Sequence, residues 1–232
     1  IAQRAPLPYR NYQASEDYYS AGQMIWLDVD GQLRALSGGK KTLDDFGKAF
    51  FGMENGKWDV NTYTFEDVVK TLNDIAPYDW TKYLRTRLDG HGPLTGGIES
   101  HGWKLVYTDK PSDAVKAIES RRHTADLTYS LGLSIGKDGA IGDVLWDGPA
   151  FKAGISPGMT VVAVNSQDYA ADALKEAVTA SAKDKNQPVE LLVKNFDEYK
   201  TVRIDYHGGL KYPHLVRDNS RPDTLTTLLK AR

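Results

Sequence analysis

The residue types that most often carry catalysis are few and scattered in this sequence. The chain has no cysteine, so disulfides, thiol catalysis and cysteine metal sites are excluded. Its five histidines are His91, His101, His123, His207 and His214. No two of them are four residues apart, so none belongs to a His-Glu-x-x-His zinc helix. Acidic neighbours such as Glu99 and Asp89 are better interpreted as polar loop residues than as metal ligands. We therefore expect no metal ion and no cofactor in this chain.

Two short motifs resemble ligand-binding loops, but their residues fit helical segments better. Ser37-Gly-Gly-Lys40 lacks the first glycine of a phosphate-binding loop, and it fits the C-terminal end of a helix. Asp28-Val-Asp30-Gly31 resembles part of a calcium loop, but its first ligand position would be Trp26. The chain also has no Gly-x-Ser-x-Gly nucleophile elbow. No hydrolase or nucleotide site is predicted from these segments.

The second half of the chain carries a glycine loop followed by a fixed order of motifs. They are Leu131-Gly132-Leu133-Ser134, Asp147-Gly-Pro-Ala150, Gly154-Ile155, Pro157-Gly158 and Val164-Asn165. In this order they resemble a PDZ domain over residues 125–207, which implies a small, partly open β-barrel with two helices. The chain has Met159 and Ser166 where the family often has aspartate and glycine. Those positions affect a turn more than they affect ligand contact.

The PDZ resemblance implies a peptide-binding groove. Backbone N–H groups around Leu131, Gly132 and Leu133 would hold a C-terminal carboxylate, and the following strand would accept a peptide by β-augmentation. Leu174 and Val178, four residues apart on an expected helix, would form the opposite wall and favour an apolar C-terminal residue. The alternative is a groove filled by a segment of the same chain, such as the tail, that binds no free peptide.

The first half carries a second set of segments. They are Ser15-Glu-Asp-Tyr18-Tyr19-Ser-Ala-Gly22, Trp26-Leu27-Asp28, Thr42-Leu-Asp44-Asp45-Phe46, Tyr63-Thr64-Phe65-Glu66-Asp67 and Tyr83-Leu-Arg85. This run resembles the C-terminal part of the catalytic domain in the glycyl aminopeptidase family, zinc metallopeptidases related in fold to thermolysin. That family carries a PDZ domain directly afterwards and a tail that resembles Tyr212-Pro213-His214-Leu215 and Arg221-Pro222-Asp223. The resemblance implies a zinc helix upstream of this region, so the zinc belongs to a longer parent enzyme.

One catalytic residue is implied by the same resemblance. In related aminopeptidases a tyrosine followed three residues later by glycine donates its hydroxyl to the tetrahedral intermediate. Tyr19 and Gly22 have this spacing, and Tyr18 does not. A phenol has a pKa of ~10, so it is neutral near pH 7 and can donate to an oxyanion. The alternative is that Tyr18 and Tyr19 are ordinary aromatic packing at a helix start.

Helical patterns must position the tyrosine. Ser15 is expected to cap a first helix whose apolar residues recur at spacings of three and four up to Leu36. Thr42 and Thr64 predict the starts of two more helices, and Asp79 starts a fourth. Residues 89–100 are expected as a loop, and residues 103–107 as a short strand.

Shorter elements must position the glycine loop. Strands are expected over residues 127–135, 140–146, 160–164, 189–194 and 201–206. Helices are expected over residues 149–153 and 171–181, a hairpin loop over residues 196–199, and a last helical turn over residues 225–229. The resulting prediction is an all-α helical subdomain followed by an α+β PDZ domain. Its parts are residues 1–107 (helical part of the catalytic domain), 108–124 (linker), 125–207 (PDZ domain) and 208–232 (docking tail).

Composition excludes several classes of function. Lys and Arg number 29 against 31 Asp and Glu, so a net charge of -2 gives no broad positive field for nucleic acid. Mean hydropathy is -0.48, and no apolar run approaches the ~20 residues of a membrane span. The first residue is Ile1 and no signal peptide follows it, so we interpret the chain as a piece of a longer protein.

The predicted function follows from the resemblance. The parent would be a zinc metallo-aminopeptidase that removes small N-terminal residues such as glycine, with zinc-bound water attacking the carbonyl. This fragment alone would be inactive, and a periplasmic or otherwise exported location is expected from the resemblance. The rival hypothesis is a non-catalytic PDZ peptide-binding module on a helical scaffold, and a third is an inactive family member. An upstream HExxH sequence would discriminate among them.

Overall fold

The computed structural model describes Tyr9 and residues 17–54, 56–90 and 92–230 of the chain. These residues form two compact units. The helical unit contains residues 17–105 and the C-terminal segment from Leu215, and the sheet unit contains Val106–His214 together with Tyr9. The expected helix cap Ser15 and the histidine His91 lie outside the described residues.

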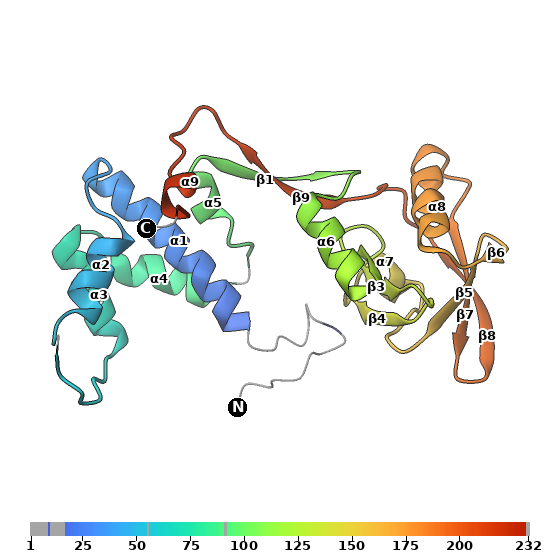
Figure 1. Cartoon of the computed structure of the whole chain (residues 1–232), viewed down its shortest axis with the longest axis horizontal. Coiled ribbons are helices and arrows are strands. Elements are labelled where there is room, and N and C mark those ends of the chain that lie inside the picture. Colours follow the sequence, from blue (N-terminus) through green and yellow to red (C-terminus); the bar gives the residue numbers. More distant parts are fainter. Residues whose placement is uncertain (1–8, 10–16, 55, 91, 231–232) are drawn as a thin grey trace. The chain divides into compact units, whose positions relative to one another are not determined.

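Helices build most of the helical unit (Figure 1). They are α1 (Asp17–Ser37), α2 (Leu43–Phe51), α3 (Phe65–Ile75), α4 (Trp80–Leu88), α5 (Gly96–Ser100) and α9 (Leu225–Leu228). On α1, Ile25, Val29 and Leu33 recur every four residues, so they share one face, and all three are buried. That face packs into one core with side chains of α2, α3 and α4, among them Phe46, Phe50, Leu72, Trp80 and Leu84.

Side-chain caps fix where three of these helices begin. Thr42 caps α2 while Asp45 accepts the Thr42 N–H at 2.9 Å, and Thr64 and Asp67 form the same reciprocal pair at α3. Asp79 accepts an N–H of the first turn of α4. Each such cap stabilises a helix by about 1 kcal/mol. The helix starts predicted at Thr42, Thr64 and Asp79 are confirmed.

Helices α1 and α5 cross at very short range because glycines line the contact. A Cβ added at Gly97 would lie 2.7 Å from the backbone nitrogen of Asp28, and one added at Gly31 would lie 2.0 Å from the Ser100 hydroxyl. Neither position has room for a side chain. The sequence pattern predicted a loop over residues 89–100, because Gly97 and its neighbouring glycines disfavour a helix. The structure has the short helix α5 there, since the close approach to α1 requires a glycine.

Strands β1 (Trp103–Thr108) and β9 (Tyr212–Arg217) pair with each other, and the boundary between the units falls inside both. The helical unit therefore includes strand residues, and the expected all-α subdomain is corrected to a mixed one. Strand β9 was not predicted, since Pro213 disfavours a strand in a sequence pattern.

The sheet unit contains the elements between these two strands. They are α6 (Asp113–Arg122), β2 (Thr124–Leu127), β3 (Leu133–Gly136), β4 (Ile141–Val144), α7 (Pro149–Lys152), β5 (Thr160–Val164), β6 (Gln167–Asp168), α8 (Ala171–Lys183), β7 (Val189–Asn195) and β8 (Glu198–Ile204). Two antiparallel sheets result, with orders β2-β3-β4 and β6-β5-β7-β8. A bridge between Ala140 and Thr160 links them, and the described strands do not close into a barrel.

Two expectations about this unit differ from the structure. The continuous strand expected over residues 127–135 is instead the last residue of β2, a turn over residues 128–132 and the first three residues of β3, and Gly132 in the turn adopts a φ of 78°. The stretch expected as a linker, residues 108–124, contains α6, whose start is capped by Ser112. Its many charges hid the helix, since α6 has no buried residue to give it an apolar stripe.

Candidate functional site

The residues predicted to form a peptide groove come from the loop after β2, from β3 and from α8. Leu131, Leu133, Leu174 and Val178 are at most 1% exposed and belong to the same hydrophobic core. The structure therefore brings the predicted lining residues into one buried cluster. Their side chains already have neighbours, so the cluster is packed.

The glycine loop has a conformation that only glycine adopts easily. Gly132 has a φ of 78°, and an added Cβ would lie 3.4 Å from Gly148 and Pro149. Its carbonyl accepts the N–H of Leu145 at 2.8 Å, and the Leu131 carbonyl accepts the N–H of Ala150 at 2.8 Å. The carbonyls of Leu131 and Gly132 thus hold the loop against the segment that leads into α7.

The edge of β3 that was expected to receive a peptide is already paired. Strand β3 lies between β4 on one side and β2 on the other, both antiparallel. The N–H of Gly132 donates to the carbonyl of Leu127, at the end of β2, across 3.0 Å. The expectation of an exposed strand edge is corrected, because the preceding segment folds back onto it.

The tyrosine predicted as a catalytic residue lies in the first turn of α1. The side chain of Tyr19 is 65% exposed, and its ring packs against that of Tyr18 at 4.6 Å between centroids. Gly22 follows one turn later, and a Cβ added there meets no other described atom within 4 Å. Tyr19 and the open surface over Gly22 are therefore neighbours on α1.

Both residues line an apolar cavity of about 580 Å³ within the helical unit. Its walls come from α1, α2, the start of α3 and Leu228 of α9, and aromatic rings dominate them: Tyr18, Trp26, Phe46, Phe50, Phe51 and Tyr63. Gly47 of α2 also lines the cavity, and a Cβ added there meets no other described atom within 4 Å. The cavity is of the size and polarity typical of ligand pockets.

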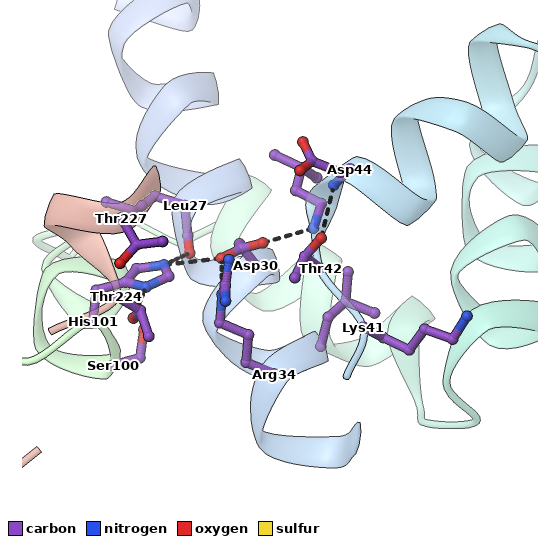
Figure 2. Close-up of polar contacts among 12 residues, drawn as sticks. Leu27, Asp30, Arg34, Lys41, Thr42, Asp44, Ser100, His101, Thr224 and Thr227 are labelled. Atoms are coloured by element: carbon purple, nitrogen blue, oxygen red, sulfur yellow. Dashed lines mark hydrogen bonds and ion pairs between the residues drawn. The ribbon is translucent and has the colours of Figure 1, made fainter. Parts of the chain in front are cut away.

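Sequence reasoning missed a buried polar cluster that joins α1 to α2, α5 and α9 (Figure 2). Asp30 is fully buried, and its two carboxylate oxygens accept the Leu43 N–H at 2.6 Å and the Arg34 guanidinium at 2.5 Å. His101 is also fully buried and lies 3.5 Å from the same carboxylate. Its Nε2 donates to the Leu27 carbonyl at 3.1 Å.

The surroundings of His101 favour its neutral form. Burial lowers the pKa of His101 below its usual range, and the Asp30 carboxylate opposes this shift only in part. Because Nε2–H faces the Leu27 carbonyl, Nδ1 is the acceptor, and the Thr224 hydroxyl donates to it at 2.6 Å. Since Asp30 and His101 are both closed off from solvent, this cluster acts as a structural connection and offers no site for a substrate.

The described residues show neither a metal-binding cluster nor a membrane-spanning helix. In that part of the chain, no cluster of three or more His, Cys, Asp or Glu side chains is placed to hold a metal ion. Nor does any described helix combine the length and the apolar character that crossing a membrane requires.

Comparison with known proteins gives a likeness of fold. No protein-family model and no curated protein matches the chain. An aminopeptidase N family protein from Idiomarina loihiensis has a similar structure, with a TM-score of 0.57 and 19% identity over 96% of this chain. The match covers 39% of that protein, so the chain spans well under half of its length. This chain therefore shares the fold of the matching part of that protein.

A second solved structure matches part of the chain. The HtrA3 PDZ domain bound to a phage-derived ligand (FGRWV) aligns over 51% of this chain and 95% of its own, with 15% identity and a TM-score of 0.25. The strand pairing described above defines the geometry of the expected groove.

Proposed function

We propose that this chain is the C-terminal part of a zinc metallo-aminopeptidase that removes small N-terminal residues such as glycine from peptides. Within it, Tyr19 is the catalytic residue that donates a hydrogen bond to the oxyanion of the tetrahedral intermediate. The observation that carries the proposal is the exposed side chain of Tyr19 beside Gly22, in the lining of an apolar cavity. The fold shared with part of an aminopeptidase N family protein supports it.

The glycines of the cavity support a site that must stay open. A glycine inside a helix costs about 1 kcal/mol relative to alanine. Gly22 and Gly47 both occupy helix interiors and both line the cavity, yet neither contacts a described atom that would exclude a methyl group. Packing within the described residues does not explain why either position is a glycine. A substrate that needs the space in the cavity would explain both glycines.

The described residues do not fit a zinc site, because their His, Asp and Glu side chains form no cluster of three. In this proposal the metal is held by the upstream part of the parent enzyme. The role of this chain is then to present the Tyr19 hydroxyl from the first turn of α1 and to form the walls of the cavity. An exported, periplasmic location belongs to the same proposal and rests on the resemblance of the sequence.

The test is a pair of conservative variants in the full-length parent enzyme. Tyr19→Phe should lower kcat by about 10²–10³, which is the usual loss for one oxyanion donor. Tyr18→Phe is the matched control, since it removes an equivalent hydroxyl from the stacked neighbour and should leave kcat unchanged. A well-folded Tyr19→Phe enzyme with unchanged kcat would contradict the catalytic role and leave Tyr19 as an ordinary packing residue.

The rival proposal is a non-catalytic module that binds peptides at the glycine loop. Gly132 supports it through a loop conformation suited to close backbone approach, and the pairing of β3 on both edges counts against it. The presence of an HExxH sequence upstream in the parent gene would favour the enzyme, and its absence would favour the module.

A further inference from the structure

Strand β2, which lies on the edge of β3 where a peptide was expected, has the direction of a bound peptide. Strand β2 runs antiparallel to β3, with Thr124 opposite Gly136 and Leu127 opposite Leu133. Peptides that bind by β-augmentation add to a free strand edge in the same manner. The C-terminal end of β2 therefore reaches the glycine loop, where a peptide's last residue would lie.

Leu127 occupies the position of that last residue. Its carbonyl accepts the N–H groups of Ser130 and Gly132, both at 3.0 Å, in place of a terminal carboxylate. Its side chain is fully buried in the same core as Leu131 and Val178. Ala125, two residues earlier on the same strand face, is also buried. The N–H of Gly132 and the buried position beside Leu131 and Val178 are thus both occupied from within the chain.

Polar contacts outside the core hold β2 in place. The Glu119 carboxylate of α6 accepts the backbone N–H of Asp126 at 2.8 Å and pairs with Lys175 of α8 at 3.2 Å. The Glu119 side chain is 12% exposed, so this ion pair is screened by water much less than a surface pair. Ser130 accepts the N–H of Lys211 at 3.0 Å, which ties the loop to the segment before β9. Strand β2 is therefore held by α6 directly, through Glu119, and by α8 indirectly, through the ion pair of Lys175 with Glu119.

We propose that β2 is a built-in ligand of the groove, and that the groove is closed to free C-terminal peptides in the resting protein. A segment joined by the short turn at residues 128–132 has an effective concentration on the order of mM or higher, so a free peptide at µM concentration cannot compete. The groove then serves as an intramolecular clasp between β2, β3 and α8. The tail, the other candidate occupant, is not needed to fill it.

The first test uses hydrogen exchange in the intact chain. The amides of Ser130 and Gly132 should exchange as slowly as those of the central strand β7, since all are held in the same closed structure. Rapid exchange at Ser130 and Gly132 with protection retained in β7 would overturn the proposal, because it would mean that β2 leaves the groove often.

The second test is a titration with a free-acid heptapeptide that copies residues 121–127 and with its C-terminal amide. Wild type should bind neither below about 1 mM, on the basis of the mM effective concentration of β2. Asp126→Pro removes the N–H that Glu119 accepts and leaves Ala125 and Leu127 intact, so it should free the groove. This variant should bind the free acid at least about tenfold more tightly than wild type does, and more tightly than it binds the amide.

The matched control is Asp113→Pro, at the first position of α6, where a proline is tolerated. It should behave as wild type. Binding of the free acid by wild type at µM concentration would overturn the proposal. Binding absent from a folded Asp126→Pro chain whose Gly132 amide has become exchangeable would also overturn it. If Asp126→Pro does not fold, the exchange experiment on wild type decides alone.

Discussion

The hydroxyl of Thr224 donates a hydrogen bond to Nδ1 of His101 across 2.6 Å, although the two residues lie far apart in the sequence. The imidazole thereby joins the C-terminal segment to α1, since its other nitrogen faces the Leu27 carbonyl. His101 and Asp30 are among the few polar side chains in the fully buried interior. Changes to this cluster should therefore report on the stability of the helical unit.

The stability of the helical unit should fall when the solution is acidified below neutrality. Burial lowers the pKa of His101, so the unfolded chain takes up the proton at a higher pH than the folded chain does. The stabilising contribution is complete above about pH 6.5, and it is lost as the pH falls from there through the lowered pKa. Urea midpoints at pH 7.5 and 5.5 measure the loss, which cannot exceed about 1.4 kcal/mol per pH unit.

The control for this pH dependence is a histidine in solvent. His101→Gln should flatten the pH dependence, whereas His123→Asn should leave it unchanged, because His123 is exposed and asparagine tolerates its φ of 53°. An equal slope in wild type and His101→Gln would assign the acid sensitivity to other groups.

Removal of the buried carboxylate should destabilise the protein strongly. Asp30→Ala leaves Arg34 and the Leu43 N–H without their partner in a site closed to water, which costs about 3–5 kcal/mol. Asp74→Ala is the matched control, because its ion pair with Lys70 is exposed and contributes less than about 1 kcal/mol. Chemical denaturation measures both. Similar small losses in the two variants would contradict a structural role for Asp30.

The 232-residue chain should bind no stoichiometric zinc and should hydrolyse no aminoacyl substrate. Its histidines have no zinc-helix spacing, and the described acidic and histidine side chains form no group of three. Elemental analysis after dialysis against a chelator gives the answer. One tightly held zinc per chain would contradict this prediction and place a metal site in this chain.

The sequence predicted local structure well and non-local structure poorly. The caps at Thr42, Thr64 and Asp79 depend on contacts three residues apart, so the sequence alone contains them. The shared burial of Leu174 and Val178 was also predictable from spacing, since the two residues lie on one helix face. The pairing of β2 with β3 was not, because a short apolar run gives no signal for a turn inside it.

The buried cluster was missed for a related reason. Asp30 directly follows Val29 of the apolar stripe, where a charged residue is expected to face solvent, and its partner His101 follows a glycine-rich stretch. Neither position shows its partner in the sequence. The close crossing of α1 and α5 creates the cluster, and Gly97, which permits this crossing, is one of the glycines that favoured a loop.

The C-terminal segment should be protected from exchange. Leu225 is buried, and the N–H of Leu228 donates to the Thr224 carbonyl at 2.9 Å. Thr224→Val should raise the exchange rate of Leu228, because it leaves a buried imidazole nitrogen unpaired at a cost of about 1–3 kcal/mol. Thr227→Val, at an exposed position, should have no such effect. Fast exchange throughout residues 210–229 of wild type would contradict docking of the tail.

Gly22→Ala should separate a structural role of this glycine from a functional one. No described atom within 4 Å excludes a methyl group, so alanine should stabilise α1 by about 0.5–1 kcal/mol through its higher helix propensity. In the full-length parent the same methyl group would project beside Tyr19 in the lining of the cavity. We expect kcat/KM to fall there while the thermal midpoint rises. Ala21→Gly is the matched control, which should lower stability and leave kcat/KM unchanged. A Gly22→Ala enzyme that is both more stable and fully active would remove the functional reason for this glycine and weaken the assignment of the cavity as the substrate site.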